Sequence, residues 1–145
     1  MEAIATLKQL KAASLRAMHP NVPEYAIPTP KYSDKTANGL TRCIMDYIRL
    51  NGGYCVRVNT QGQYRTGIGW TKSTTTKGTP DITAIVNGMA ISIEVKVGKD
   101  RLSEHQIKQA DAISSAGGLY CVARNFEGFC KWYCENVEKK GGKHG

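Results

Sequence analysis

Residues 81–96 constrain the fold more than any other part of the chain. They read DITAIVNGMAISIEVK, so two short runs rich in Ile and Val flank Asn87-Gly88. An Asn-Gly pair between such runs is the strongest short-range signal for a β-hairpin with a two-residue turn. The sequence therefore predicts a hairpin whose pairing places Asp81 directly opposite Glu94.

The two faces of this hairpin differ in chemistry because side chains alternate along a strand. One face is wholly apolar and belongs against a core: Ile82, Ala84, Val86, Met89, Ile91, Ile93 and Val95. The other face carries Asp81, Glu94 and Lys96, with the small side chains of Thr83 and Ser92. Opposed carboxylates destabilise a sheet, and a hard divalent cation offsets their repulsion better than one lysine does. The pattern indicates a metal site, and a half-exposed hairpin with an incidental charge cluster is the alternative.

Three sequence blocks resemble a known nuclease family. Pro80-Asp81, followed after the hairpin by Glu94-Val95-Lys96, resembles the signature of the PD-(D/E)XK nuclease superfamily. Residues 98–106 (GKDRLSEHQ) and 41–62 (TRCIMDYIRLNGGYCVRVNTQG) are similar to its VRR-NUC branch, the virus-type replication–repair nucleases related to Holliday-junction resolvases. The resemblance covers most of the chain. It implies an α/β fold with a restriction-endonuclease-like core, in which helices flank a mixed central sheet.

The resemblance also implies a set of catalytic residues: Asp81, Glu94, Lys96 and Gln106. Asp81 and Glu94 would hold Mg²⁺ or Mn²⁺ together with the backbone carbonyl of Val95. Lys96 would lie beside the scissile phosphate, because phosphodiester hydrolysis needs a nucleophilic water and neutralisation of developing negative charge. A neighbouring cation lowers the pKa of a lysine, so a role for Lys96 as a base stays open.

Gln106 has two interpretations that do not exclude each other. Ser103 and Gln106 form a capping-box pattern, in which the glutamine reaches back to the backbone N–H of the helix cap. In the family that the sequence resembles, a glutamine on this helix lies beside the catalytic face and orients the lysine or the water.

Five further side chains are candidates for contact with DNA: Arg57, Asn59, Lys77, Lys99 and Arg101. The first two resemble the family's Arg-x-Asn strand, although an ordinary surface ladder is an alternative. The other three lie in predicted loops, where flexible cations commonly meet phosphates. Taken singly, each of these three is more simply explained as a solvated side chain. The net charge of +8 favours an anionic partner, and nucleic acid is the commonest.

One region departs from the family pattern. Many relatives place a Glu on the first core helix, whereas residues 35–40 here read KTANGL. Asn38 could act as a neutral ligand or hold a water, and Asp46, two turns further along, is a weaker candidate. Because a carboxylate is missing, the sequence leaves open whether one or two metal ions bind.

Periodicity and the positions of Gly and Pro predict the remaining elements. Helices are expected at 2–18, 35–50, 103–116 and 127–137, and strands at 54–60 and 119–124. Four prolines exclude regular structure from residue 20 to about 33, and residues 61–79 read as a loose hairpin or a mobile loop.

The chain divides into an N-terminal helix with a Pro-rich arm (1–33), a nuclease-like domain (34–138) and a flexible basic tail (139–145). The arm is a strap across the domain, a dimerisation element or a DNA contact.

Cysteine usage and hydropathy narrow the class of protein. The chain has five cysteines and no Cys-x-x-Cys pattern, so core packing is a better explanation for them than zinc. No apolar run is long enough to span a membrane, and the charged N-terminus does not read as a secretory signal. We expect a cytoplasmic protein of a bacterial cell or a phage-infected host, with no membrane partner.

Together with the hairpin carboxylates and the basic charge, the resemblance implies a metal-dependent DNA endonuclease that acts on branched or flapped DNA in replication or repair. A symmetric homodimer is expected by analogy with resolvases, which cut two strands. A non-catalytic DNA-binding module that retains the nuclease fold is the alternative from another class. A nuclease directed at RNA or tRNA comes third.

Overall fold

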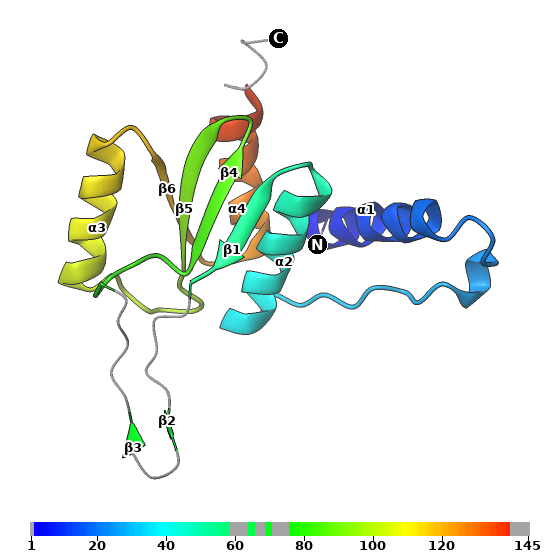
Figure 1. Ribbon diagram of the computed structural model, residues 1–145, viewed down its shortest axis with the longest axis horizontal. Coiled ribbons are helices and arrows are strands. Elements are labelled where there is room, and N and C mark those ends of the chain that lie inside the picture. Colours follow the sequence, from blue (N-terminus) through cyan, green and yellow to red (C-terminus); the bar gives the residue numbers. More distant parts are fainter. Residues whose placement is uncertain (1, 59–63, 66–68, 71–75, 140–145) are drawn as a thin grey trace.

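The computed structural model describes residues 2–58, 64–65, 69–70 and 76–139. Four strands form a mixed sheet in the order β1-β4-β5-β6 (Figure 1). Their bounds are Tyr54–Arg57, Ile82–Val86, Met89–Val95 and Leu119–Ala123. The first three are joined antiparallel, whereas β5 and β6 are parallel and are connected by a helix, as parallel pairing requires. The predicted α/β class with a mixed central sheet is confirmed.

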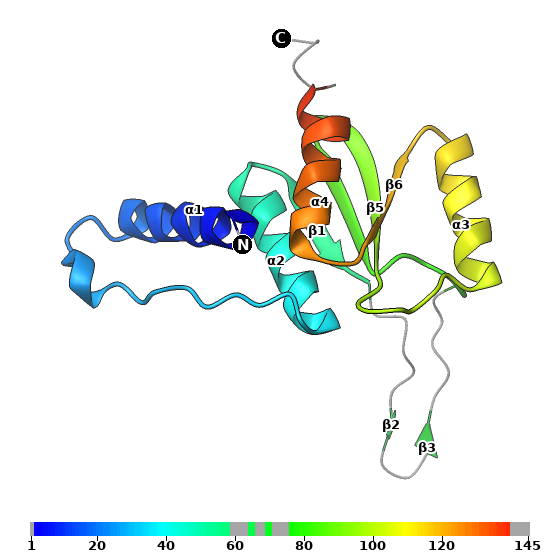
Figure 2. The same cartoon turned by 180° about the vertical axis from the view of Figure 1, so that it is seen from behind.

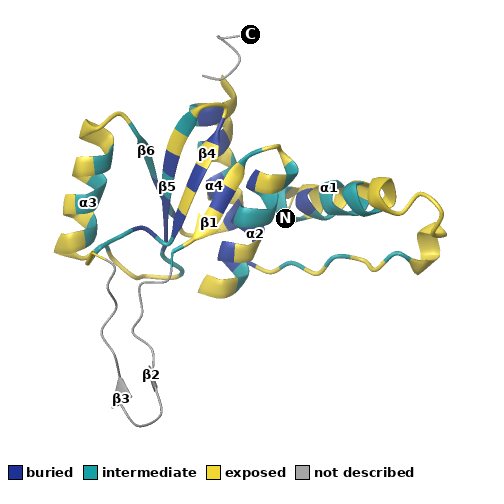
Figure 3. Cartoon of the chain, viewed as in Figure 1, coloured by how far each residue is buried: buried dark blue, intermediate teal, exposed yellow. Residues whose placement is uncertain are grey.

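Helices cover both sides of this sheet (Figure 2). Their bounds are Glu2–Met18 for α1, Ala37–Leu50 for α2, Glu104–Ser115 for α3 and Phe126–Tyr133 for α4, which continues as a π-helical turn at Cys134–Glu138. The helices α2 and α4 pack with the apolar face of the hairpin into one core. The helix α3 contacts β6 and reaches Glu94, which faces away from that core. Figure 3 shows the resulting alternation of buried and exposed residues along β4.

The central hairpin forms as predicted. Asn87 and Gly88 have φ values of 51° and 78°, which are those of a type I′ turn. Val86 pairs with Met89 and Ile82 with Ile93, so Asp81 and Glu94 lie one step beyond the last pair. The predicted apolar face is buried except for Met89, which is partly buried.

The N-terminal helix α1 has the predicted bounds and contacts α2 and α4, with Leu7 fully buried. Beyond it the chain turns and returns as an extended segment, much of which is exposed (Figure 3). The prediction of no regular structure in this arm is wrong at one point, because Glu24–Ala26 form a single 3-10 turn. An ion pair of 2.7 Å between Arg16 and Glu24 links that turn to α1.

The other predicted elements exist with small shifts in their ends. The helix expected from residue 35 begins at Ala37, because the Thr36 hydroxyl accepts a hydrogen bond from Gly39 N–H and caps it. Of the two possibilities for residues 61–79, the hairpin is present, with β2 (Tyr64–Arg65) antiparallel to β3 (Gly69–Trp70). Residues 59–60 of the predicted strand and 140–145 of the predicted tail lie outside the described residues.

The cysteines are free thiols, and Cys43, Cys55 and Cys121 are buried as the core-packing prediction requires. Cys130 is partly buried and Cys134 is exposed, so packing does not explain Cys134. No helix in the described part of the chain is long and apolar enough to cross a membrane.

Candidate active site

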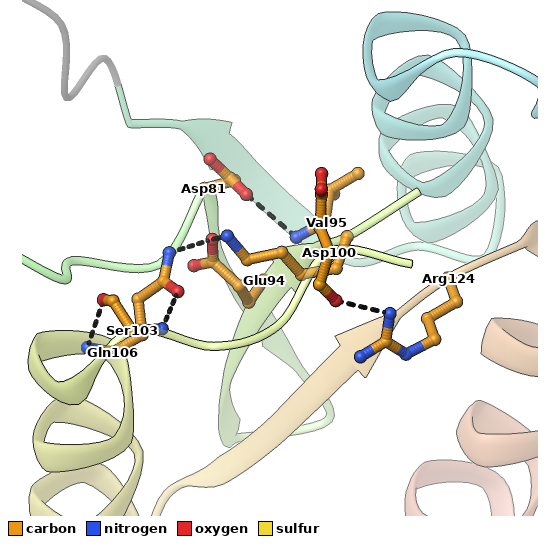
Figure 4. A network of polar contacts seen from close by, with 8 residues as sticks. Asp81, Glu94, Val95, Asp100, Ser103, Gln106 and Arg124 are labelled. Carbon is orange, nitrogen blue, oxygen red and sulfur yellow. Dashed lines mark hydrogen bonds and ion pairs between the residues drawn. The ribbon is translucent and has the colours of Figure 1, made fainter. Parts of the chain in front are cut away.

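Asp81 and Glu94 meet where the open end of the hairpin reaches α3 (Figure 4). Asp81 immediately precedes β4, and Glu94 is the last residue but one of β5. An oxygen of the Asp81 carboxylate accepts a hydrogen bond of 2.8 Å from Val95 N–H. Because this bond crosses from one strand to the other, it holds the Asp81 side chain against the end of β5.

Glu94 lies in an environment that disfavours its charge. Only 3% of the residue is exposed, and burial, together with the neighbouring Asp81 carboxylate, raises its pKa to about 7. Its Oε1 accepts a hydrogen bond of 2.8 Å from Gln106 and lies 3.9 Å from Nζ of Lys96. Its Oε2 is buried and has no hydrogen-bond partner within the described residues. A buried carboxylate oxygen without a partner is costly, so Oε2 needs a hydrogen-bond donor or a cation, and no described side chain donates to it.

Gln106 forms the predicted capping box, and its side chain also contacts Glu94. Its side-chain oxygen accepts a hydrogen bond of 2.8 Å from Ser103 N–H, and Ser103 accepts one from Gln106 N–H, which completes a capping box. Its Nε2 donates to Glu94. Because the cap occupies the oxygen of the amide, the amide presents its donor side to the carboxylate. The capping box therefore orients the contact with Glu94.

Lys96 directly follows β5, and its backbone N–H donates a hydrogen bond of 2.9 Å to the carbonyl of Ala123. This bond continues the parallel pairing of β5 and β6 by one residue. The Lys96 side chain is only 18% exposed, so it is not a freely solvated strand lysine.

The loop between β5 and α3 is held from the neighbouring strand. The guanidinium of Arg124 donates a hydrogen bond of 2.7 Å to the carbonyl of Asp100 (Figure 4). It donates another, of 3.3 Å, to the carbonyl of Gly98. These two hydrogen bonds hold the backbone of the loop that carries the exposed side chains of Lys99 and Arg101. Arg124 could not be predicted from the sequence, because its partners are backbone carbonyls more than 20 residues away.

The other candidate residues from the sequence lie in different surroundings. Arg57 donates a hydrogen bond of 2.8 Å to the side-chain oxygen of Asn38, so these two residues form a pair between β1 and α2. Lys77 is exposed, and Asn59 lies outside the described residues. Asp46 accepts a hydrogen bond of 2.7 Å from the Tyr32 hydroxyl. It does not join Asp81 and Glu94, since no three Asp, Glu, His or Cys side chains gather into a metal-binding group in the described part.

Gly78 places the segment before Asp81 against the start of α3. Its φ is +81°, and a Cβ there would overlap the backbone carbonyl of His105, the residue before Gln106. This close approach therefore fixes the position of the segment before Asp81 relative to the start of α3, the helix that carries Gln106. No turn motif in the sequence signals this contact.

We expect Gly78→Ala to lower both stability and the rate of any reaction at this site, because the helix start has to move away from Asp81 and Glu94. Gly88→Ala is the matched control, since Gly88 has a φ of +78° with no atom within 4 Å of an added Cβ. The backbone strain of about 1–2 kcal/mol is common to both variants. Urea unfolding and catalytic assays on the pair separate strain from displacement, and equal effects in both variants would contradict this role for Gly78.

A solved structure described as "VRR_NUC domain" is similar to this chain. The two align with a TM-score of 0.53 and 18% sequence identity, over 72% of this chain and 99% of that chain. No protein-family model and no curated protein matches the sequence. At this identity the likeness shows the fold, and the chain has the fold of a VRR_NUC domain, as the sequence resemblance predicted.

Proposed function

We propose that this chain is a metal-dependent endonuclease that hydrolyses phosphodiester bonds in DNA. The observation that carries the proposal is the pair of carboxylates at the end of the hairpin, with one buried oxygen of Glu94 left without a partner. The fold supports the same proposal, because the structurally similar domain bears the name of a nuclease family.

The chemistry of the donor set fits a hard divalent cation. Mg²⁺ and Mn²⁺ prefer oxygen ligands, and Mg²⁺ is commonly held by one or two carboxylates together with water and substrate phosphate. Asp81 and Glu94 would hold the ion, with the Val95 carbonyl as a further ligand. The ion supplies positive charge that stabilises the transition state and makes a water nucleophilic at neutral pH.

The side chains around the carboxylates have separate tasks in this proposal. Gln106 fixes one oxygen of Glu94, so that the other oxygen stays directed at the cation. The bond from Val95 N–H does the same for Asp81. Lys96, close to Glu94 and largely shielded from solvent, donates to the phosphate and stabilises the charge that develops on it.

The proposed substrate is DNA with a branch or a flap, in replication or repair. The net charge of +8 supports binding to a polyanion. Lys77 lies in the segment before Asp81, and Lys99 and Arg101 lie in the loop after β5. All three are exposed and would contact the DNA backbone. A symmetric homodimer would supply two active sites for two strands, and this remains a proposal by analogy.

The test incubates the wild type with plasmid DNA and with synthetic four-way junctions in Mg²⁺, Mn²⁺ or EDTA. We expect cleavage with either ion, none in EDTA, and products with 5′-phosphate and 3′-hydroxyl ends. Asp81→Asn is the negative control, because it keeps the size and the acceptor oxygen of the side chain but removes the charge of a proposed metal ligand. Binding of DNA without cleavage in any of these buffers would contradict the proposal and favour a binding module that retains the fold.

A further inference from the structure

Two buried side-chain oxygens lack a hydrogen-bond partner in the described part of the chain, and they belong to Glu94 and Tyr120. The metal proposal accounts for the first. It does not account for the Tyr120 hydroxyl. Buried polar groups without partners are rare and each costs about 1–3 kcal/mol, so this hydroxyl needs an explanation.

The strand register places Tyr120 beside the active site. In the parallel pairing of β5 with β6, Ser92 pairs with Tyr120 and Glu94 pairs with Val122. Side chains two residues apart on a strand share a face, so Tyr120 lies on the same face of the sheet as Glu94. Figure 2 shows the two strands side by side.

Electrostatics agrees with this placement. Burial raises the pKa of Tyr120 to about 12, and the next contributions come from the carboxylates of Glu94 and Asp81. The hydroxyl is therefore protonated at neutral pH and is available as a hydrogen-bond donor near these two carboxylates.

The two atoms without partners have complementary hydrogen-bonding capacity. Tyr120 offers a donor and Glu94 offers an acceptor, but no direct hydrogen bond joins them. Ordered waters commonly satisfy buried polar groups that cannot reach each other. A carboxylate oxygen has two lone pairs, so a water on one leaves the other for a cation.

We propose that Tyr120 is a positioning residue of the nuclease centre: its hydroxyl donates to a water that donates to Oε2 of Glu94, and so orients this carboxylate toward the cation. The inference rests on the proposed function and adds to it a residue on β6. Its effect on catalysis passes through Glu94.

The test compares Tyr120→Phe with Tyr47→Phe. Both changes remove only a hydroxyl, and Tyr47 packs against Phe126 and Tyr133 of α4, on the opposite side of the sheet. Affinity for Mn²⁺ is measured by calorimetry without DNA, and kcat and KM for a junction are measured at fixed and at saturating Mn²⁺. Partners that orient metal ligands are typically worth 10–100-fold in metal affinity or activity.

We expect Tyr120→Phe to weaken Mn²⁺ binding about tenfold or more and to lower kcat at fixed Mn²⁺, with KM for DNA unchanged. Tyr47→Phe should match the wild type in all three quantities. If Tyr120→Phe also matches a wild type that binds Mn²⁺ and cleaves DNA, the inference fails while the proposed function stands. A wild type that takes up no Mn²⁺ overturns both.

A crystal structure of the metal-free wild type tests the same point without a variant. We expect an ordered water within hydrogen-bond distance of both Tyr120 Oη and Glu94 Oε2. The absence of a water between these two atoms, or a Tyr120 hydroxyl turned away from Glu94, would overturn the inference.

Discussion

Lys96→Ala is expected to lower the rate of DNA cleavage by about 10²–10³-fold at saturating metal, the range found when one group that stabilises transition-state charge is removed. The lysine is only 18% exposed, and its Nζ lies 3.9 Å from Glu94, so its charge acts at the site rather than in bulk solvent. Initial rates on a four-way junction, resolved into kcat and KM, provide the measurement. The decrease in the cleavage rate should appear in kcat.

Lys99→Ala is the matched control for this change. Lys99 is three residues further along the chain and exposed on the loop, and in the proposed function it contacts only the DNA backbone. We expect its loss to raise KM and to reduce the salt dependence of binding, with little change in kcat. If the two alanine variants lose the same amount of kcat, or if Lys96→Ala keeps full activity, Lys96 has no part in the chemistry.

Glu94→Gln is expected to stabilise the metal-free protein at pH 8 while abolishing cleavage. The pKa of Glu94 is about 7 in the folded protein against an ordinary 4.5, so the folded state binds more protons than the unfolded state between these values. The contribution of Glu94 to the stability of the wild type is therefore most favourable below pH 4.5 and is lost as the pH rises through 7. The loss amounts to about 3 kcal/mol above pH 7. Glutamine carries no charge and keeps an acceptor for Gln106, so the variant avoids this loss.

Urea unfolding in EDTA at pH 5 and pH 8 measures this effect. The advantage of the variant over the wild type should grow between the two pH values. Adding Mg²⁺ at pH 8 should stabilise the wild type and leave the variant unchanged, because binding only to the folded state raises stability. A wild type with the same stability at both pH values, or a variant that Mg²⁺ stabilises equally, would contradict this account of Glu94.

The hairpin and its two carboxylates could be predicted because their geometry is local. The Asn87-Gly88 turn fixes the register, and the register alone brings Asp81 opposite Glu94. The contact of Gln106 with its cap is local for the same reason. The family resemblance implied only that Gln106 lies beside the catalytic face. Its contact with Glu94 was not predicted, since it depends on how α3 packs against the sheet.

Features that depend on pairing across the chain could not be predicted. Tyr120 shares a face of the sheet with Glu94 only because β6 pairs in parallel with β5, and Arg124 reaches the loop at residue 98 for the same reason. Helical spacing suggested Asp46, but the end of the arm lies against α2, and the Tyr32 hydroxyl donates a hydrogen bond to that carboxylate. The approach of Gly78 to α3 is likewise a contact between distant backbone segments.

The most direct test of the central claim is the anomalous scattering of Mn²⁺ in crystals of the wild type. We predict a peak bounded by the carboxylates of Asp81 and Glu94 and the carbonyl of Val95, and its loss in crystals of Glu94→Gln. A peak elsewhere on the chain, or no peak at a concentration of Mn²⁺ that supports cleavage, would contradict the assignment of this hairpin as the metal centre.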